Sequence, residues 1–137
     1  MSAAPLILTT NGLDDYSLLD SGNGRKLERF NDVVTDRPDT QAIWAPLKPE
    51  LWDSAKAIFA KNEKDAQWTL SPELKVSWQV KWNELCFNLH FTSFKHVGVF
   101  PEHASQWEWI REKIKALKEQ NVLNLFGYTG GATLAAV

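Results

Sequence analysis

The chain has 137 residues, 44% of them hydrophobic, 23% charged and 12% aromatic, a composition typical of a soluble globular protein that excludes a mainly disordered chain. Its net charge is −2 and no segment concentrates basic residues, so charge alone gives no sign of nucleic-acid binding. The chain has one cysteine, Cys86, which excludes an internal disulfide framework. No apolar run approaches the ~20 residues of a membrane helix, which argues against a membrane protein. The start has no signal-peptide pattern, so a cytoplasmic location is expected.

Three short strands are predicted between residues 16 and 37, at 16–20, 26–30 and 33–35. They are separated by turn residues at 21–24 and 31–32, where glycine and asparagine tolerate the positive φ of tight turns. This pattern predicts an antiparallel β-meander.

A helix over residues 50–59 is predicted next. Pro49 suits the first helical position, because its ring fixes φ and its missing N–H is not needed there. Apolar residues then keep helical spacing at Leu51, Ala55, Ile58 and Phe59.

Two later segments alternate with a period of two and are predicted to pair as an antiparallel hairpin with a turn near Asn83. The apolar face of the first segment carries Val76, Trp78 and Val80. The apolar face of the second carries Leu85, Phe87, Leu89 and Phe91.

The period changes to that of a helix over residues 104–119, where Trp107, Ile110, Ile114 and Leu117 form an apolar stripe. A short buried strand is then predicted at 122–126, a tight glycine loop at 127–131 and a second helix at 132–136.

This order of elements predicts an α+β chain in two parts. Residues 1–92 are expected to form an amino-terminal antiparallel β domain with a helix, and residues 93–137 the incomplete start of a Rossmann-like α/β domain. A parallel strand needs a crossover and a neighbour, which one strand and two helical turns do not supply. The chain is therefore expected to be the amino-terminal part of a longer protein.

The glycine loop at 127–131 is the candidate ligand site. Glycines let a ligand approach the backbone closely, and free N–H groups at a helix start favour an anionic group. The spacing Gly-x-x-Gly-Gly matches neither the dinucleotide fingerprint nor the phosphate loop of nucleotide hydrolases, which disfavours NAD and ATP. Taken alone, the pattern is equally compatible with a simple turn.

The segment Asn-Val-Leu-Asn-Leu-Phe-Gly-Tyr-Thr-Gly-Gly-Ala-Thr-Leu-Ala-Ala at 121–136 resembles the first motif of class I S-adenosylmethionine (SAM)-dependent methyltransferases, in the branch of the large-subunit ribosomal RNA methyltransferases. Residues 94–102 and the Trp-Glu-Trp-Ile segment at 107–110 resemble the region before that motif, and residues 19–30 resemble the amino-terminal β segment of a subset of the branch.

The resemblance implies that one half of a SAM site lies in this chain. Residues from the glycine motif would line the methionine end of SAM: Asn124, Phe126, Gly127, Tyr128, Thr129, Gly130 and Gly131. Lys95, Phe100 and Glu102 would approach the same pocket from the preceding segment. The acidic residue that binds the ribose would lie beyond Val137, and so would the catalytic motif, so the chain alone is expected to be inactive. RNA is one candidate acceptor of the complete protein, and a protein or a small molecule stays open as an alternative.

Other interpretations stay open. The chain is alternatively a non-catalytic, tryptophan-rich β interaction module, or a degenerate gene fragment. A stacking platform of its seven tryptophans, a catalytic His96 and a nucleophilic Cys86 are each weaker than a structural role. No residues have metal-ligand spacing.

A last expectation concerns the carboxy-terminal segment. Without the neighbouring strands of a complete sheet, Leu123, Leu125, Phe126 and Leu134 would be partly exposed. Exposed apolar edges favour association, so the chain is predicted to self-associate through this segment or to have a mobile carboxy-terminal tail.

Overall fold

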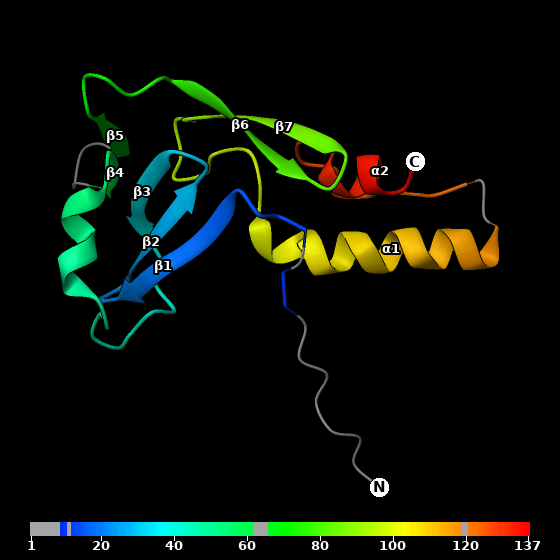
Figure 1. The fold of residues 1–137 in the computed structure, drawn as a ribbon, viewed down its shortest axis with the longest axis horizontal. Helices are drawn as coiled ribbons and strands as arrows, with labels where there is room; N and C mark the ends of the chain where they lie inside the picture. The colour runs from blue at the N-terminus through cyan, green and yellow to red at the C-terminus, as the bar shows by residue number, and fades with distance from the viewer. Residues whose placement is uncertain (1–8, 11, 62–65, 119–120) are drawn as a thin grey trace, which may run out of the picture.

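A computed structural model describes residues 9–10, 12–61, 66–118 and 121–137. Two sheets and a helical region follow one another along the long axis of the molecule (Figure 1). The strands are β1 (Tyr16–Gly22), β2 (Arg25–Phe30), β3 (Val33–Pro38), β4 (Ala57–Lys61), β5 (Ala66–Leu70), β6 (Ser77–Trp82) and β7 (Leu85–His90). The helices are the 3-10 helices η1 (Pro49–Ser54) and η2 (Pro101–His103) and the α-helices α1 (Ala104–Leu117) and α2 (Gly131–Ala135).

The first sheet has five strands in the order β1-β2-β3-β4-β5. The predicted meander of β1, β2 and β3 is confirmed, and its turns use Asn23, Gly24 and Asn31 at positive φ (51°, 73° and 55°). The prediction that this part is antiparallel throughout is wrong at one point, because β3 and β4 pair in parallel. The long connection through η1 makes that parallel crossover possible.

The helix predicted over residues 50–59 is correct only in its first half and wrong in its second. A 3-10 helix ends at Ser54, Ala55 is extended (φ −64°, ψ 119°), and the chain continues as β4. In β4, Ala57 and Phe59 are buried while Ile58 is 39% exposed, which is the alternation of a strand. The strand is fixed by pairing with β3 and with β5, which the sequence pattern did not predict.

The predicted hairpin at 76–91 is confirmed as β6 and β7, with Val80 opposite Phe87 and Trp82 opposite Leu85. Its apolar face packs against α1 and forms the main core. Trp107 of α1 contacts Trp82 edge-on and stacks on Phe87, with ring centroids 5.3 Å apart in both pairs. The remaining buried members of this core are Leu13, Phe30, Val80, Leu89, Val97, Val99, Ala104 and Ala135.

Buried polar groups tie the segments between these elements to the first sheet. Glu28 and Arg37 are 0% and 4% exposed, and Arg37 Nε and Nη2 contact Glu28 Oε2 at 2.7 and 2.6 Å. Arg37 Nη1 also donates to the backbone oxygen of Lys95 at 2.9 Å. This buried ion pair therefore positions the chain just before η2, where the candidate site begins.

The strand predicted at 122–126 is wrong. No ladder forms there, because none of the strands that the structure describes lies beside this segment. The expected exposure is confirmed at Leu123 (82%), Leu125 (75%), Phe126 (92%) and Leu134 (46%). The predicted glycine loop and second helix are present, with α2 beginning at Gly131.

None of the helices in the described ranges is long and apolar enough to cross a membrane.

Candidate functional site

A cavity of about 360 Å³ lies where the chain before α1 meets the glycine loop. Two stretches far apart in sequence line it, residues 96–107 on one side and residues 126–132 on the other. Its lining is His96, Val99, Phe100, His103, Trp107, Phe126, Gly127, Tyr128, Thr129, Gly131 and Ala132. Aromatic and small residues dominate, which is typical of pockets for organic ligands.

The glycine loop has a fixed shape. The backbone N–H of Gly130 donates to the oxygen of Gly127 at 2.7 Å, and Tyr128 and Gly130 both adopt positive φ (48° and 92°). Thr129 Oγ1 donates to the backbone oxygen of Gly98 at 2.6 Å. The loop is therefore anchored to the segment that forms the opposite wall of the cavity.

Gly131 is required for packing between the loop and α1. A Cβ at this position would lie 2.7 Å from Cζ2 and 3.2 Å from Cε2 of Trp107. These distances are shorter than van der Waals contact, so only glycine lets α2 begin this close to the tryptophan ring.

An aromatic cluster forms one wall of the cavity. The ring centroid of Phe100 lies 5.0 Å from that of Tyr128, 5.1 Å from that of His96 and 5.4 Å from that of His103. Tyr128 is 57% exposed, so its ring borders the cavity while remaining open to solvent. Such a wall can pack against an apolar chain or against a cationic group through its π faces.

A smaller cavity of about 200 Å³ adjoins the first, and the two share His96 and Phe100. Its lining is charged and includes Lys26, Arg37, Asp39, Lys95 and Glu102. Lys95 Nζ donates to the backbone oxygen of Pro38 at 3.1 Å. Burial, followed by the neighbouring cations Arg37, Lys95 and Lys26, lowers the pKa of His96.

The structure brings most of the predicted site residues together, in two adjoining cavities. Phe126, Gly127, Tyr128, Thr129, Gly131 and Phe100 line the aromatic cavity, and Lys95, Phe100 and Glu102 line the charged one.

Asn124 and Gly130 lie outside both linings. Asn124 Nδ2 donates to Thr133 Oγ1 at 2.9 Å, and its Oδ1 accepts from the backbone of Phe126 at 3.2 Å, so this side chain shapes the entry to the loop. Gly130 supplies the left-handed turn before α2.

Five residues of the cavity, His96, Val99, His103, Trp107 and Ala132, were not predicted as site residues. The histidines have the spacing of neither a metal site nor a catalytic dyad, and Trp107 belongs to an apolar helical stripe. His96 and His103 meet only because residues 96–107 fold around Phe100, whose ring contacts both imidazoles. No sequence signal identifies these ring contacts.

Within the described part of the chain, no group of three or more histidine, cysteine, aspartate or glutamate side chains could hold a metal ion.

A comparison with models of known protein families finds none that matches the chain, and a comparison with curated proteins finds no match either.

Solved structures do match. The SAM-dependent methyltransferase from Agrobacterium tumefaciens is 42% identical, with a TM-score of 0.86 over 98% of this chain and 44% of that one. A candidate SAM-dependent methyltransferase from Streptococcus mutans is 15% identical, with a TM-score of 0.63 over 92% of this chain and 36% of that one. SMU.776, a candidate methyltransferase in complex with S-adenosylhomocysteine (SAH), is 14% identical, with a TM-score of 0.57 over the same shares.

The chain thus spans less than half the length of each of these proteins. The predicted resemblance to SAM-dependent methyltransferases is confirmed at the level of the fold, whereas the ribosomal RNA branch stays a prediction.

Proposed function

We propose that this chain is part of a SAM-dependent methyltransferase and carries one side of its SAM site. The observation that carries the proposal is the likeness to the Agrobacterium tumefaciens methyltransferase, 42% identical across 98% of this chain. The fold is also shared with a protein whose structure contains SAH. An aromatic cavity at the glycine motif supplies a place for the ligand.

The residues of the two cavities suit the methionine half of SAM. A volume of about 360 Å³ is in the range of small-molecule pockets. The methionine chain carries a positive sulfonium, which the rings of Phe100 and Tyr128 would stabilise. Its carboxylate would face the glycine loop, and the ammonium of Lys95 in the adjoining cavity would supply a positive charge.

The share of the Agrobacterium protein that this chain matches bears on which functions need further residues. Because this chain covers 44% of the Agrobacterium protein, we propose that the ribose contacts and methyl transfer itself need residues outside this chain. We also propose that the β-rich part ends at residue 92 and that the SAM-binding part begins at residue 93. RNA is the acceptor that we propose, on the resemblance of residues 121–136 to the ribosomal RNA branch.

Titration of the ¹⁵N-labelled chain with SAM, followed by NMR, tests the proposal. We expect saturable shifts in residues 98–102 and 126–131. Tyr128→Ala should weaken binding, because it removes a ring that contacts Phe100. Trp109→Ala is the matched control: Trp109 is equally exposed at 57% but does not line the cavity.

Equal affinity of both variants, or shifts confined to the first sheet, would contradict the proposal. Stoichiometric RNA binding that SAM leaves unchanged would instead favour the interaction module.

A further inference from the structure

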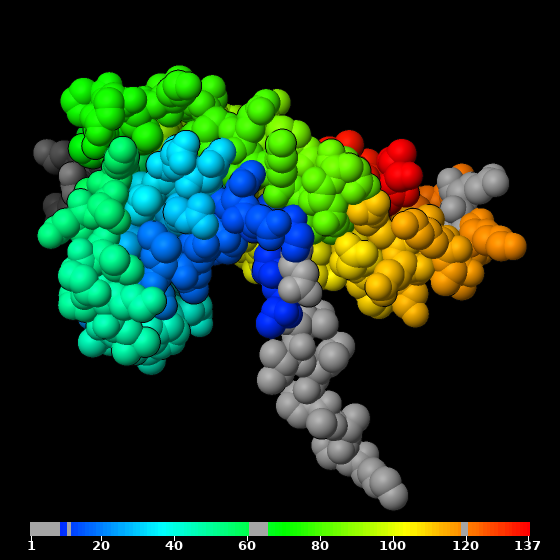
Figure 2. Space-filling model, in the orientation of Figure 1, coloured from blue at the N-terminus to red at the C-terminus, as the bar shows by residue number. Residues whose placement is uncertain are grey.

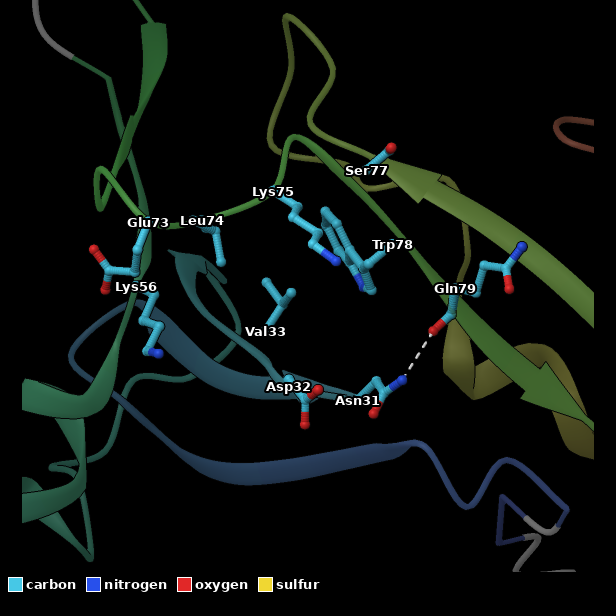
Figure 3. Close-up of a pocket in the computed structure, with 10 residues that line it drawn as sticks. All are labelled: Asn31, Asp32, Val33, Lys56, Glu73, Leu74, Lys75, Ser77, Trp78 and Gln79. Atoms are coloured by element: carbon cyan, nitrogen blue, oxygen red, sulfur yellow. Dashed lines mark hydrogen bonds between the residues drawn. The ribbon is translucent and has the colours of Figure 1, made fainter.

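A third cavity, of about 490 Å³, lies between the two sheets (Figure 3) and shares no lining residue with the candidate SAM site. Its walls come from the turn between β2 and β3 with the first residue of β3, from the residue before β4, and from the chain that leads into β6 with the first three residues of that strand. Figure 2 shows the surface of the whole molecule in the orientation of Figure 1, with β2 and β3 in light blue to cyan and the segment from β4 to β6 in green.

Backbone hydrogen bonds fix the walls of this inter-sheet cavity. Lys56 N donates to Val34 O at 3.0 Å, and Ser71 N donates to Lys56 O at 2.8 Å. Leu74 N in turn donates to Ser71 O at 3.0 Å. On the opposite side, Asn31 Nδ2 donates to Gln79 O at 3.4 Å, which joins the two sheets (Figure 3). These hydrogen bonds hold the walls of the cavity in place.

The wall contains a buried donor without a partner. The indole N–H of Trp78 is buried, and none of the described residues accepts a hydrogen bond from it. The ring cannot easily turn to find one, because it packs against Phe91 with centroids 4.8 Å apart. Nearly all buried donors in proteins are paired, so an unpaired one at a cavity points to a missing acceptor.

The charges around Trp78 favour an anionic acceptor. In Figure 3 the ammonium of Lys75 turns toward the cavity beside the indole, while the carboxylates of Asp32 and Glu73 point away from its centre. Lys75 makes no ion pair with any residue that the structure describes. Val33 and Leu74 provide an apolar surface between these groups.

We infer that the inter-sheet cavity binds a ligand through an anionic oxygen, a carboxylate or a phosphate. A shift of the neighbouring Lys75 side chain uncovers the buried Trp78 Nε1, which then donates a hydrogen bond to that oxygen. The oxygen also pairs with the ammonium of Lys75, and the rest of the ligand contacts Val33 and Leu74. A charged acceptor strengthens the hydrogen bond in a site that is partly shielded from water.

NMR of the ¹⁵N-labelled indole groups tests this inference, with inorganic phosphate and benzoate as separate probes. One or both should shift the Trp78 resonance saturably, and the probe that acts identifies the group as phosphate or carboxylate. The Trp44 resonance should stay in place, because its N–H already donates to Ser21 O at 2.9 Å. Trp78→Phe assigns the resonance, and if that variant does not fold, through-bond experiments on the wild type assign it.

Lys75→Gln should weaken binding of the active probe by about tenfold, which corresponds to one charged contact. Lys81→Gln is the matched control, because Lys81 is an exposed lysine of β6 outside the cavity. The inference would be overturned if neither probe gave a saturable shift at millimolar concentration, or if both lysine variants weakened binding equally. It would also be overturned if a trapped water protected the indole N–H from exchange and neither anion shifted its resonance.

Discussion

Replacing Gly131 by alanine tests the packing that positions the glycine loop on α1. The new Cβ would lie 2.7 Å from Trp107 Cζ2, whereas ordinary contact begins near 3.4 Å, so something must move by about 0.7 Å. The tryptophan ring has little freedom to move, because it packs edge-on against Trp82 and stacks on Phe87. Overpacking of this kind costs about 1–3 kcal/mol. Alanine recovers part of that, up to ~1 kcal/mol, through its lower entropy loss in the helix.

The expected net loss is therefore about 1–2 kcal/mol. For a chain of 137 residues the melting temperature falls by ~3.5 °C per kcal/mol, so calorimetry should show a decrease of about 4–7 °C. Gly127→Ala is the control: its φ is not positive and the nearest atom to its Cβ, Asn124 Nδ2, is 3.9 Å away. In a Trp107→Phe background the alanine at 131 should cost much less. A Gly131→Ala variant as stable as Gly127→Ala would refute the reasoning.

Three further predictions concern charge and the exposed segment. Glu28→Gln should destabilise the chain by about 3–5 kcal/mol in urea unfolding, because it leaves Arg37 buried without its charged partner. Asp36→Asn should cost clearly less, because the side chains of the Arg25–Asp36 pair are 30% and 14% exposed. Burial raises the pKa of Asp20, but hydrogen bonds from Trp52, Lys48, Leu47 and Ser21 outweigh it and lower the pKa to about 2. Its contribution to stability is thus present above pH ~4 and lost between pH ~4 and ~2, and acid titration of Asp20→Asn should show a flatter profile over that range. Light scattering should detect self-association that Phe126→Asp reduces, since Phe126 is 92% exposed; a wild-type chain that stays monomeric when concentrated would contradict this.

Local patterns predicted the elements whose partners are close in sequence. The hairpin alternates as predicted, with Val80, Trp82, Phe87 and Leu89 buried. The meander was predicted from its turns, where Asn23 and Gly24 adopt the expected positive φ. The apolar stripe of α1 is buried at Trp107, whereas Leu117 at its end is 65% exposed. In each case sequence neighbours supply the pairing or the packing, so local preference and tertiary structure agree.

The errors occur where distant partners decide. Residues 55–59 have helical spacing, yet Ile58 and Phe59 also suit a strand, and pairing with β3 and β5 selects the strand. Residues 122–126 have strand composition but no neighbouring strand among the described residues, so no ladder forms. The glycine loop was predictable from its spacing, whereas the approach of His96 and His103 to it depends on the fold of the segment before α1.

The most direct test of the account places the methionine part of SAM next to the aromatic wall. SAM labelled with ¹³C in its methionine carbons, added in excess to the chain, should give intermolecular NOEs from those protons to the rings of Phe100 and Tyr128, which lie 5.0 Å apart. We expect cross-peaks to both rings, and those to the ring at position 128 should be absent in Tyr128→Ala. Cross-peaks only to rings remote from the cavity, such as Trp44 and Trp52, or none at a SAM concentration that saturates the amide shifts, would contradict it.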